Sequence, residues 1–446
     1  MLLPRIRMSA AGSSPRNRLR KAAVAASATA LVLGPVAGSA SAEPAPAPAP
    51  NLPAELIAAV QRDLKISPDE YLHRADVAQK VAAFAISAQR QYPQAYAGSW
   101  LDNTGKAVIA LSQGQGLDEA RKAAQDAGFQ VKDVAKSETV LRSEKNAFQQ
   151  WLSGQPEAVA KAVRGVVVDT MNNSIAVRVD KPGLPMPGFV DPARVIVMPA
   201  APVGPEQADD VAQPIAGQAN GSIAAGDGYA SVAGRMQLIC SSGFNGLDAK
   251  NNVVNITAGH CDPNIPAAGT ANAPGMFELL PGNHVGNQLG TFQKSILGNQ
   301  DYSIVSINDA NRDRFGNNLV RVQGAAPIAI TGVADPVVGA PVCKSGTRTG
   351  FSCGVVNAVD QTVQVGDREL TQSFSANICA LPGDSGGPIV TGTLALGISS
   401  ASSVADYPHC IIPEVLGMIT GDAPQLFAQP VNVVLSDNPG LRVRTN

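Results

Sequence analysis

The distribution of cysteines divides this chain into two halves that must be stabilised differently. None of the six cysteines precedes position 240 in a sequence of 446 residues. No CxxC pair indicates a metal site or a redox pair, and the order along the chain favours three sequential disulfides: Cys240–Cys261, Cys343–Cys353 and Cys379–Cys410. Disulfides persist in exported proteins, which meet an oxidising environment. The sequence therefore predicts a cysteine-free N-terminal half and a disulfide-bonded C-terminal half.

The first 42 residues have the parts of a secretory signal peptide. Basic residues between Arg5 and Lys21 precede the uncharged run AAVAASATALVLGPVAG, and the small residues Ala40-Ser41-Ala42 follow. A membrane anchor is the alternative, but the run is shorter than the roughly 20 apolar residues of a spanning helix and is interrupted by Gly34-Pro35. We expect removal of residues 1–42, no membrane attachment afterwards, and a secreted, extracellular product.

Residues 43–222 fall into three segments of different composition. Residues 43–50, EPAPAPAP, predict an extended spacer. Residues 51–200 have apolar residues at helical spacing in ELIAAVQRDL, ADVAQKVAAFAISAQRQY and LDEARKAAQDAG, with strand-like runs at 106–111 and 175–179. They predict an α+β domain without a catalytic constellation, whose one histidine is His73. Residues 201–222 are rich in Ala, Pro, Gly and Gln and predict a linker with a processing site.

Residues 223–446 consist of short β-rich runs that are separated by Gly, Asn and Pro. Examples are RMQLIC, NNVVNITAG, QLGTFQKSI, DYSIVSI, LVRVQG, APVCKSG, TVQVGD, GPIVTG and LALGISS. Many short strands with regular turn signals are typical of sandwiches and barrels. A single helix is expected near residues 423–435.

The charge balance excludes nucleic acid as the main partner. Lys and Arg number 34 against 36 Asp and Glu, for a formal net charge of −2. A protein that binds a phosphate backbone needs a strongly basic face. Nothing in this composition provides one.

Three short segments of the β-rich half contain the residue types of nucleophilic catalysis. They are TAGHC at 257–261, NQDYSIV at 299–305 and PGDSGGP at 382–388. A serine hydroxyl is a weak nucleophile that needs an adjacent base, and imidazole serves as that base near pH 7. A buried carboxylate fixes the imidazole tautomer and stabilises the cation that forms. The Gly-rich turn around Ser385 offers the backbone N–H groups of Gly383 and Ser385 to a developing oxyanion.

Two other hydrolase types fit the sequence less well. The G-x-S-x-G pattern also matches the nucleophile elbow of α/β-hydrolases, which places an acid and a histidine after the serine on a parallel sheet. Asp406 and His409 follow Ser385 too closely for intervening βα units. A metal hydrolase is disfavoured because there is no HExxH and no ligand-spaced His/Cys cluster. His284 and His409 are expected at turn or surface positions, and no metal or cofactor is expected.

The three segments resemble those of chymotrypsin-like serine endopeptidases, most closely the secreted actinobacterial streptogrisin and α-lytic protease group. CALPGDSGGP, CKSGTRTGFSC and AQPVNV extend the resemblance over residues ~223–446. It implies an all-β domain of two packed antiparallel β-barrels with a C-terminal helix and the active site between the barrels. It makes His260 the general base, Asp301 its orienting carboxylate and Ser385 the nucleophile. Gly383 and Ser385 become the oxyanion donors.

Upstream similarity is confined to two short motifs. GSWLDNTGKAVI and RGVVVDT resemble pieces of that group's pro-regions. The resemblance implies that residues 51–200 are a pro-region that inhibits the protease and aids its folding, with cleavage between Ala201 and Gly226. An accessory or binding domain is the alternative.

Four positions differ from that group's pattern or bear on its specificity. Bacterial members have an arginine where Lys344 stands, so we expect an ion pair between Lys344 and Asp384. The group usually has two glycines where Ala401 and Ser402 stand at the edge of the substrate pocket. Because Ile378, Ala401 and Ser402 are uncharged, we predict a neutral pocket that favours medium apolar side chains such as Leu or Met.

The sequence as a whole predicts a secreted serine endopeptidase that is made as a pre-pro-protein. We expect it to be a monomer, to act on protein or peptide substrates, and to bind its own pro-region. A non-catalytic, protease-like binding module is the alternative from another class. Such proteins commonly lose a member of the triad, whereas all three residue types are present here.

Overall fold

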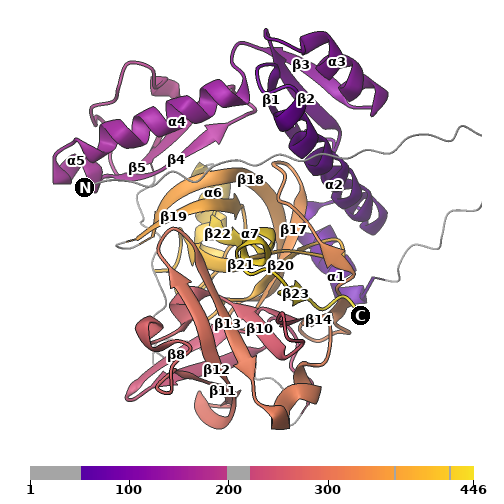
Figure 1. Cartoon of the computed structure of the whole chain (residues 1–446), viewed down its shortest axis with the longest axis vertical. Coiled ribbons are helices and arrows are strands. Elements are labelled where there is room, and N and C mark those ends of the chain that lie inside the picture. The colour runs from indigo at the N-terminus through magenta and orange to yellow at the C-terminus, as the bar shows by residue number, and fades with distance from the viewer. Residues whose placement is uncertain (1–51, 198–220, 366–367, 421–422) are drawn as a thin grey trace, which may run out of the picture. The chain divides into compact units, whose positions relative to one another are not determined.

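The computed structural model describes residues 52–197 and 221–446, apart from 366–367 and 421–422 (Figure 1). The predicted signal peptide, the spacer and all but two residues of the predicted linker lie outside the described residues. The described residues belong to one unit, Pro50–Asn446. None of the helices within these ranges is long and apolar enough to cross a membrane.

The first described part, residues 52–197, mixes helices and strands, as the α+β pattern predicts. Its helices are α1 (Ala54–Ala59), a π-helical turn (Val60–Leu64), α2 (Pro68–Gln91), α3 (Leu117–Asp126), α4 (Glu138–Ser153), α5 (Glu157–Ala160) and a 3-10 turn (Pro192–Arg194). Its strands are β1 (Tyr96–Leu101), β2 (Ala107–Ser112), β3 (Gln130–Val134), β4 (Val163–Asp169), β5 (Ser174–Val179) and β6 (Val195–Val197). Strands β1 to β3 form a sheet of their own.

Serine caps determine where the two longest helices begin. The Ser67 hydroxyl accepts a hydrogen bond from the Glu70 N–H at 3.1 Å, and Pro68 occupies the first position of α2. Ser137 caps α4 in the same way, accepting from the Val140 N–H at 3.4 Å. The sequence interpretation missed α4, although this cap was a signal for it.

An antiparallel sheet of eight strands forms the first half of residues 221–446. Its order is β23-β9-β10-β13-β12-β11-β7-β8. The strands are β7 (Gly228–Ala233), β8 (Met236–Ser241), β9 (Phe244–Leu247), β10 (Val253–Thr257), β11 (Gly275–Leu280), β12 (His284–Leu297), β13 (Asp301–Ile307) and β23 (Arg442–Val443). Figure 1 shows β10, β12 and β13 side by side. Phe244, Ile256, Phe292 and Val305 contribute to its core.

Six strands of the second half close on themselves, because β17 pairs with both β18 and β20. They are β17 (Pro341–Gly346), β18 (Gly350–Val365), β19 (Arg368–Ala376), β20 (Pro388–Thr391), β21 (Leu394–Ser402) and β22 (Leu426–Pro430). The short strands β14 (Leu319–Val320), β15 (Ile328–Ala329) and β16 (Gly332–Val333) precede them. The predicted mostly-β protease fold is confirmed.

Strands of the first part extend this second sheet. β4 pairs antiparallel with β18, with Val166 opposite Thr362 and Gly165 opposite Val363. β5 and β6 continue the sheet beyond β4. The sheet therefore crosses from the protease half into residues 163–197.

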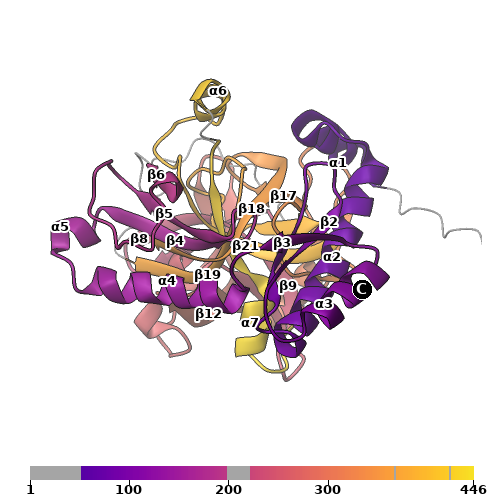
Figure 2. The same cartoon turned by 90° about the horizontal axis from the view of Figure 1, so that it is seen from above.

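The helices near the C-terminus differ from the one expected at residues 423–435. The chain forms β22 up to Pro430, and the helix α7 (Val431–Asp437) starts only after it. Proline disfavours helical geometry in the residue before it, so Gln429 stays extended. A further helix, α6 (Ile411–Thr420), was not expected and lies apart from the strands of both sheets (Figure 2).

Candidate active site

Two paired strands bring His260 and Asp301 together. β10 runs antiparallel to β13, whose first residue is Asp301. His260 follows β10 in a 3-10 turn (Gly259–Cys261). A disulfide from Cys261 to Cys240 ties this turn to β8. The histidine is therefore held beside the start of β13.

Asp301 holds His260 through two hydrogen bonds. Its Oδ2 lies 2.5 Å from His260 Nδ1, and its Oδ1 accepts the backbone N–H of His260 at 2.9 Å. The two residues are 3% and 6% exposed. Because an acidic partner at Nδ1 fixes the proton there, Nε2 is the nitrogen that is left to act as a base.

Asp301 is kept ionised despite its burial. Burial alone would raise its pKa, but the charge of His260 together with hydrogen bonds from His260 and Ser400 outweighs burial and lowers the pKa below its ordinary value. The Ser400 hydroxyl donates to Oδ2 at 2.5 Å. A charged carboxylate is what a positively charged imidazole needs beside it.

Ser385 lies in the turn that precedes β20. This turn is held by Ser241, the last residue of β8. The Ser241 N–H donates to the Ser385 carbonyl at 2.8 Å, and the Ser241 hydroxyl donates to the Gly383 carbonyl at 2.7 Å. Ser241 follows Cys240, which holds the His260 turn. No hydrogen bond joins His260 and Ser385 among the described residues, and His260 Nε2 is buried there without a partner.

The turn around Ser385 needs glycine at Gly386. This residue has φ +82°, and an added Cβ would lie 2.1 Å from Thr257 Oγ1. The Gly386 N–H donates to the Ser399 carbonyl at 2.8 Å. The backbone N–H groups of Gly383 and Ser385 donate to no other group in the described part of the chain, so both remain available to a ligand oxygen.

The structure contains an ion pair between Lys344 and Asp384, the residue before Ser385. Lys344 Nζ lies 3.4 Å from Asp384 Oδ2, and both side chains are buried. Burial lowers the pKa of Lys344, and the charge of Asp384 opposes that shift. The Asp384 carboxylate also accepts hydrogen bonds of 2.9 to 3.1 Å from the backbone N–H groups of Arg348, Thr349 and Leu381.

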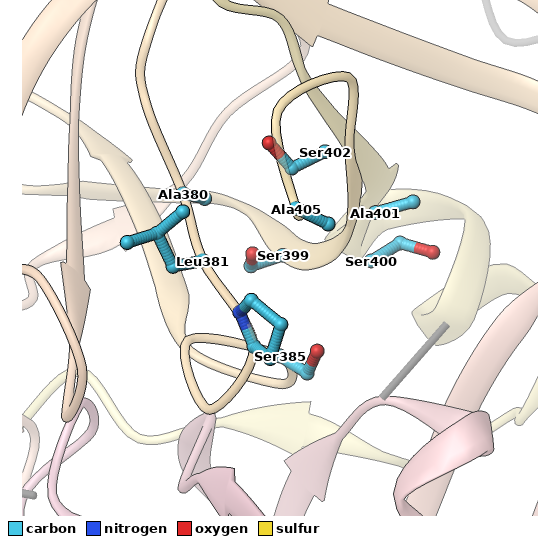
Figure 3. Close-up of a pocket in the computed structure, with 9 residues that line it drawn as sticks. Ala380, Leu381, Ser385, Ser399, Ser400, Ala401, Ser402 and Ala405 are labelled. Carbon is cyan, nitrogen blue, oxygen red and sulfur yellow. The ribbon is translucent and has the colours of Figure 1, made fainter. Parts of the chain in front are cut away.

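A narrow pocket lies next to Ser385 (Figure 3). Its lining is Ala380, Leu381, Pro382, Ser385, Ser399, Ser400, Ala401, Ser402 and Ala405, without a charged side chain. Ala401 and Ser402, which were predicted at the edge of the substrate pocket, both line this pocket. Ile378 does not line this pocket, because its side chain is buried in the core of the second sheet with Phe374 and Leu396.

All three disulfides form in the predicted sequential order. Two serines that support the site were missed from the sequence. Ser400 donates to Asp301, and Ser241 holds the turn around Ser385. Ser400 directly precedes Ala401 and Ser402, which had been singled out for the pocket only, and no sequence signal marked Ser241.

Comparisons with known proteins show the family of this chain. The Trypsin family matches residues 240–415. Streptogrisin-C of Streptomyces griseus is 30% identical over 363 residues, covering 79% of this chain and 70% of that protein. Serine protease 2 of Streptomyces fradiae is 34% identical over 183 residues, covering 41% of this chain and 95% of that protein. The chain belongs to the trypsin-like serine protease family.

This protease is thus a serine-type endopeptidase with relatives among the streptogrisins. Glutamyl endopeptidase 2 of Streptomyces griseus is 32% identical over 164 residues, covering 37% of this chain and 79% of that protein. The solved structure of Thermobifida fusca Protease A is 26% identical, covers 50% of this chain and 100% of that one, and has a TM-score of 0.38.

Proposed function

We propose that this protease cuts peptide bonds with Ser385 as nucleophile, His260 as general base and Asp301 as the carboxylate that orients the base. The observation that carries the proposal is the hydrogen bond between His260 Nδ1 and Asp301 Oδ2. It leaves Nε2 unprotonated in the neutral ring. That nitrogen can take the proton of a serine hydroxyl when substrate is bound.

The reaction runs through an acyl-enzyme. Ser385 Oγ attacks the peptide carbonyl carbon while Nε2 of His260 takes its proton, and the N–H groups of Gly383 and Ser385 receive the oxyanion. Nε2 then returns the proton to the leaving amine. A water then attacks the ester carbon while Nε2 takes one of its protons. Nε2 returns this proton to Ser385 Oγ as the bond between Oγ and the acyl carbon breaks, which releases the acid and restores the Ser385 hydroxyl.

Labelling and mutation test the triad. A serine-directed phosphonate should label Ser385, as read by mass spectrometry of the labelled peptide. Ser385→Ala and His260→Ala should both reduce turnover by a factor on the order of 10⁴ to 10⁶, because triad members act as a unit. His284→Ala, at an exposed histidine, is the matched control and should keep wild-type turnover. A Ser385→Ala variant with wild-type turnover contradicts the assignment, and a wild-type chain without label or turnover favours the binding module.

The pocket supports a preference for uncharged side chains. No basic residue lines it to receive a glutamate and no acidic residue lines it to receive lysine or arginine. The specificity in the name of Glutamyl endopeptidase 2 is therefore not proposed for this chain. We assign to the pocket the apolar residue that precedes the cut bond.

Residues 51–200 are proposed to be a pro-region that inhibits the protease and helps it fold. β4 adds to the edge of β18. The Asp360 carboxylate in β18 forms an ion pair with Arg142. The Asp360 carbonyl accepts a hydrogen bond of 2.6 Å from the Lys145 ammonium. Antiparallel barrels fold slowly because their strands pair with strands that are distant in the sequence. A bound pro-region would act as a template and favour these pairings.

Refolding decides between a pro-region and an accessory domain. Residues 223–446 are refolded with and without residues 43–200 supplied in trans, and the added domain is assayed against mature enzyme. Faster recovery of activity and inhibition are expected. If the protease half recovers full activity alone at the same rate and is not inhibited, the accessory-domain alternative is correct.

Cleavage is proposed within residues 201–222. Residues that follow are docked on the protease half: the Ile223 N–H donates to the Arg314 carbonyl at 2.8 Å and the Ala225 N–H donates to the Leu319 carbonyl at 2.9 Å. Both side chains are buried, which protects this backbone from proteolysis. N-terminal sequencing of the mature enzyme tests the site.

Secretion through a signal peptide at 1–42 and a monomeric state complete the proposal. Three disulfides support export to an oxidising compartment. Enzyme in the culture medium and a monomer in sedimentation velocity are the expected results. Retention of an active enzyme inside the cell contradicts the export.

A further inference from the structure

A helical arm, residues 52–91, packs on the protease half. It contains α1, the π-helical turn Val60–Leu64 and α2. α1 and the π-helical turn pack against β18, and α2 packs against β17. β4, the other element of residues 52–197 that meets this sheet along its backbone, pairs with β18. The proposed pro-region therefore has two attachments to the second sheet.

The two attachments lie at different ends of β18. Phe351 and Cys353, near the start of this strand, contact the arm. Thr362 and Val363, near its end, pair with β4. Thr362 is nine residues after Cys353, which is roughly 30 Å along an extended strand at about 3.3 Å per residue. The arm is thus a contact separate from the added strand.

Arg62 and Asp63 hold the arm to the start of β18. Asp63 Oδ2 accepts the Cys353 N–H at 2.8 Å. The Arg62 guanidinium pairs with Asp63 at 2.6 Å and donates to the Phe351 carbonyl at 3.3 Å. The π-helical turn is therefore fixed to the backbone of the protease half at two neighbouring positions.

α2 is fixed to two loops of the protease half. The Tyr71 hydroxyl accepts the Gly392 N–H at 2.9 Å, in the turn between β20 and β21, and Tyr71 is fully buried. The Gln79 amide donates to the Asp335 carbonyl at 3.2 Å and accepts the Asp335 N–H at 3.0 Å. Gln79 thus pairs with the backbone of Asp335 as a neighbouring strand would.

Apolar side chains fill the rest of this contact. Leu56 and Val60 have no exposed surface and belong to a buried cluster that continues into the protease half. Ala78 and Val81 of α2 are equally buried and belong to the cluster that contains Val342 of β17. Burial of apolar surface drives most protein association. The arm therefore has its own source of binding free energy.

The arm leaves the pocket beside Ser385 free. The pocket is lined by residues between Ala380 and Ala405. The residues that hydrogen-bond to the arm are not among them: Asp335, Phe351, Cys353 and Gly392. A contact outside the pocket can hold two pieces of the chain together whether or not the pocket is occupied.

We propose that the arm is a docking element in its own right, which keeps the proposed pro-region bound to the protease after the linker is cut. The bound arm holds β4 near the edge of β18, so that this pairing re-forms within one complex at a high effective concentration. Release of the pro-region then requires both contacts to break. The inference rests on the proposed cleavage within residues 201–222, because only a cut chain makes this packing an interface between two molecules.

Controlled cutting of the full chain tests the proposal. The chain carries Ser385→Ala, which removes the proposed nucleophile, and a recognition sequence for an added site-specific protease within residues 201–222. After the cut the sample is diluted, and native mass spectrometry follows the separation of the two pieces. We expect the pieces of this parent chain to stay together.

The double variant Tyr71→Phe/Gln79→Ala weakens the arm alone. It removes three hydrogen bonds and leaves the N–H groups of Gly392 and Asp335 without their acceptors, so the pieces should separate about 10- to 100-fold faster. Gln79→Ala by itself should give a smaller increase, and circular dichroism before the cut checks that each variant is folded. Ile86→Ala, at a 46% exposed residue of α2, is the matched control and should separate at the parent rate.

Gly165→Ala tests the other attachment by itself. A Cβ added at Gly165 would lie 2.6 Å from the Thr362 carbonyl oxygen, so β4 cannot keep its place beside β18. Pieces with this change should stay together through the arm, and should separate fast once Tyr71→Phe/Gln79→Ala is added. The inference is overturned if Gly165→Ala alone separates the pieces as fast as the combined variant. It is also overturned if Tyr71→Phe/Gln79→Ala separates at the parent rate.

The result is distinguishable from that of the proposed pro-region role. Pieces that stay together through the arm, from a domain that neither inhibits the mature enzyme nor speeds its refolding, support the inference and make residues 51–200 an accessory domain. Parent pieces that separate at once overturn the inference, even where the added domain inhibits the mature enzyme.

Discussion

The Ser400 hydroxyl donates a hydrogen bond of 2.5 Å to Asp301 Oδ2, the same oxygen that holds His260 Nδ1. Ser400 and the pocket wall share the strand β21. The strand that lines the substrate pocket therefore also supports the carboxylate of the proposed triad.

Removing this hydroxyl should reduce catalysis. A hydrogen bond to a charged group contributes about 1.5–3 kcal/mol, which corresponds to roughly a 10- to 100-fold fall in kcat for Ser400→Ala. Ser402→Ala is the control, because Ser402 lines the same pocket but accepts a hydrogen bond from the Val404 N–H instead. Steady-state kinetics on a peptide amide should show the loss in kcat for Ser400 alone. Equal effects of the two changes would mean that the pocket, and not Asp301, is affected.

Asp301 should make the stability of the protein depend on pH. Its pKa is lower in the folded state than in the unfolded chain, so its contribution is full above the unfolded value of about 3.9 and is lost as the pH falls through the folded pKa. We expect Asp301→Asn to be less stable than wild type at pH 7, with a difference that shrinks toward pH 3. Unfolding rates in guanidinium at several pH values measure this. Asp309→Asn, at an exposed carboxylate, is the control, and a difference for Asp301→Asn that does not change with pH contradicts the prediction.

Gly386→Ala should strongly destabilise the turn around Ser385. The cost of positive φ is about 1–2 kcal/mol, and the contact with Thr257 Oγ1 adds about 1–3 kcal/mol to the loss in free energy of unfolding. Gly324→Ala separates the two causes, since Gly324 has φ +79° and an added Cβ there would meet nothing within 4 Å. Unfolding in guanidinium should be markedly faster for Gly386→Ala than for Gly324→Ala. Similar rates would show that only backbone strain matters.

Short sequence motifs mark the residues that we propose for the triad. His260, Asp301 and Ser385 each lie within a distinctive segment, and the order of the cysteines along the chain predicted the disulfides. Ser400 could not be chosen among Ser399, Ser400 and Ser402 by pattern. The register of β21 against β22 shifts between Ser399 and Ala401, and such a bulge redirects the side chain in between.

Other errors came from the same limit of local patterns. Ile378 was expected at the pocket, but it follows the end of β19 and its side chain is buried in the core of the second sheet. The terminal helix was expected too early, because apolar spacing alone does not show that Leu426–Pro430 pairs with β19 and β21. The contacts that decide these positions join residues far apart in the sequence.

The pocket predicts which residue precedes the cut bond. Its uncharged lining should favour Leu and Met over Arg, Lys and Glu in a peptide library. Replacing Ala401 and Ser402 together by glycine enlarges the pocket, so the preference should move toward Phe and Tyr by about 10-fold in relative kcat/KM. A profile dominated by Arg or Lys contradicts the neutral pocket, and an unchanged profile in the double variant contradicts the size argument.

Asp63 should contribute to binding between the proposed pro-region and the protease. Its Oδ2 accepts the Cys353 N–H at 2.8 Å, and Cys353 is bonded to Cys343, the residue before Lys344. Asp63→Ala leaves that N–H without its acceptor, at a cost of about 1–3 kcal/mol, so the inhibition constant of the separate pro-region should rise roughly 5- to 150-fold. Asp76→Ala is the control, because Asp76 pairs with exposed Lys80 on the same helix, α2. If both variants inhibit the mature enzyme as well as wild type does, the contact of Asp63 with the disulfide loop does not contribute to inhibition.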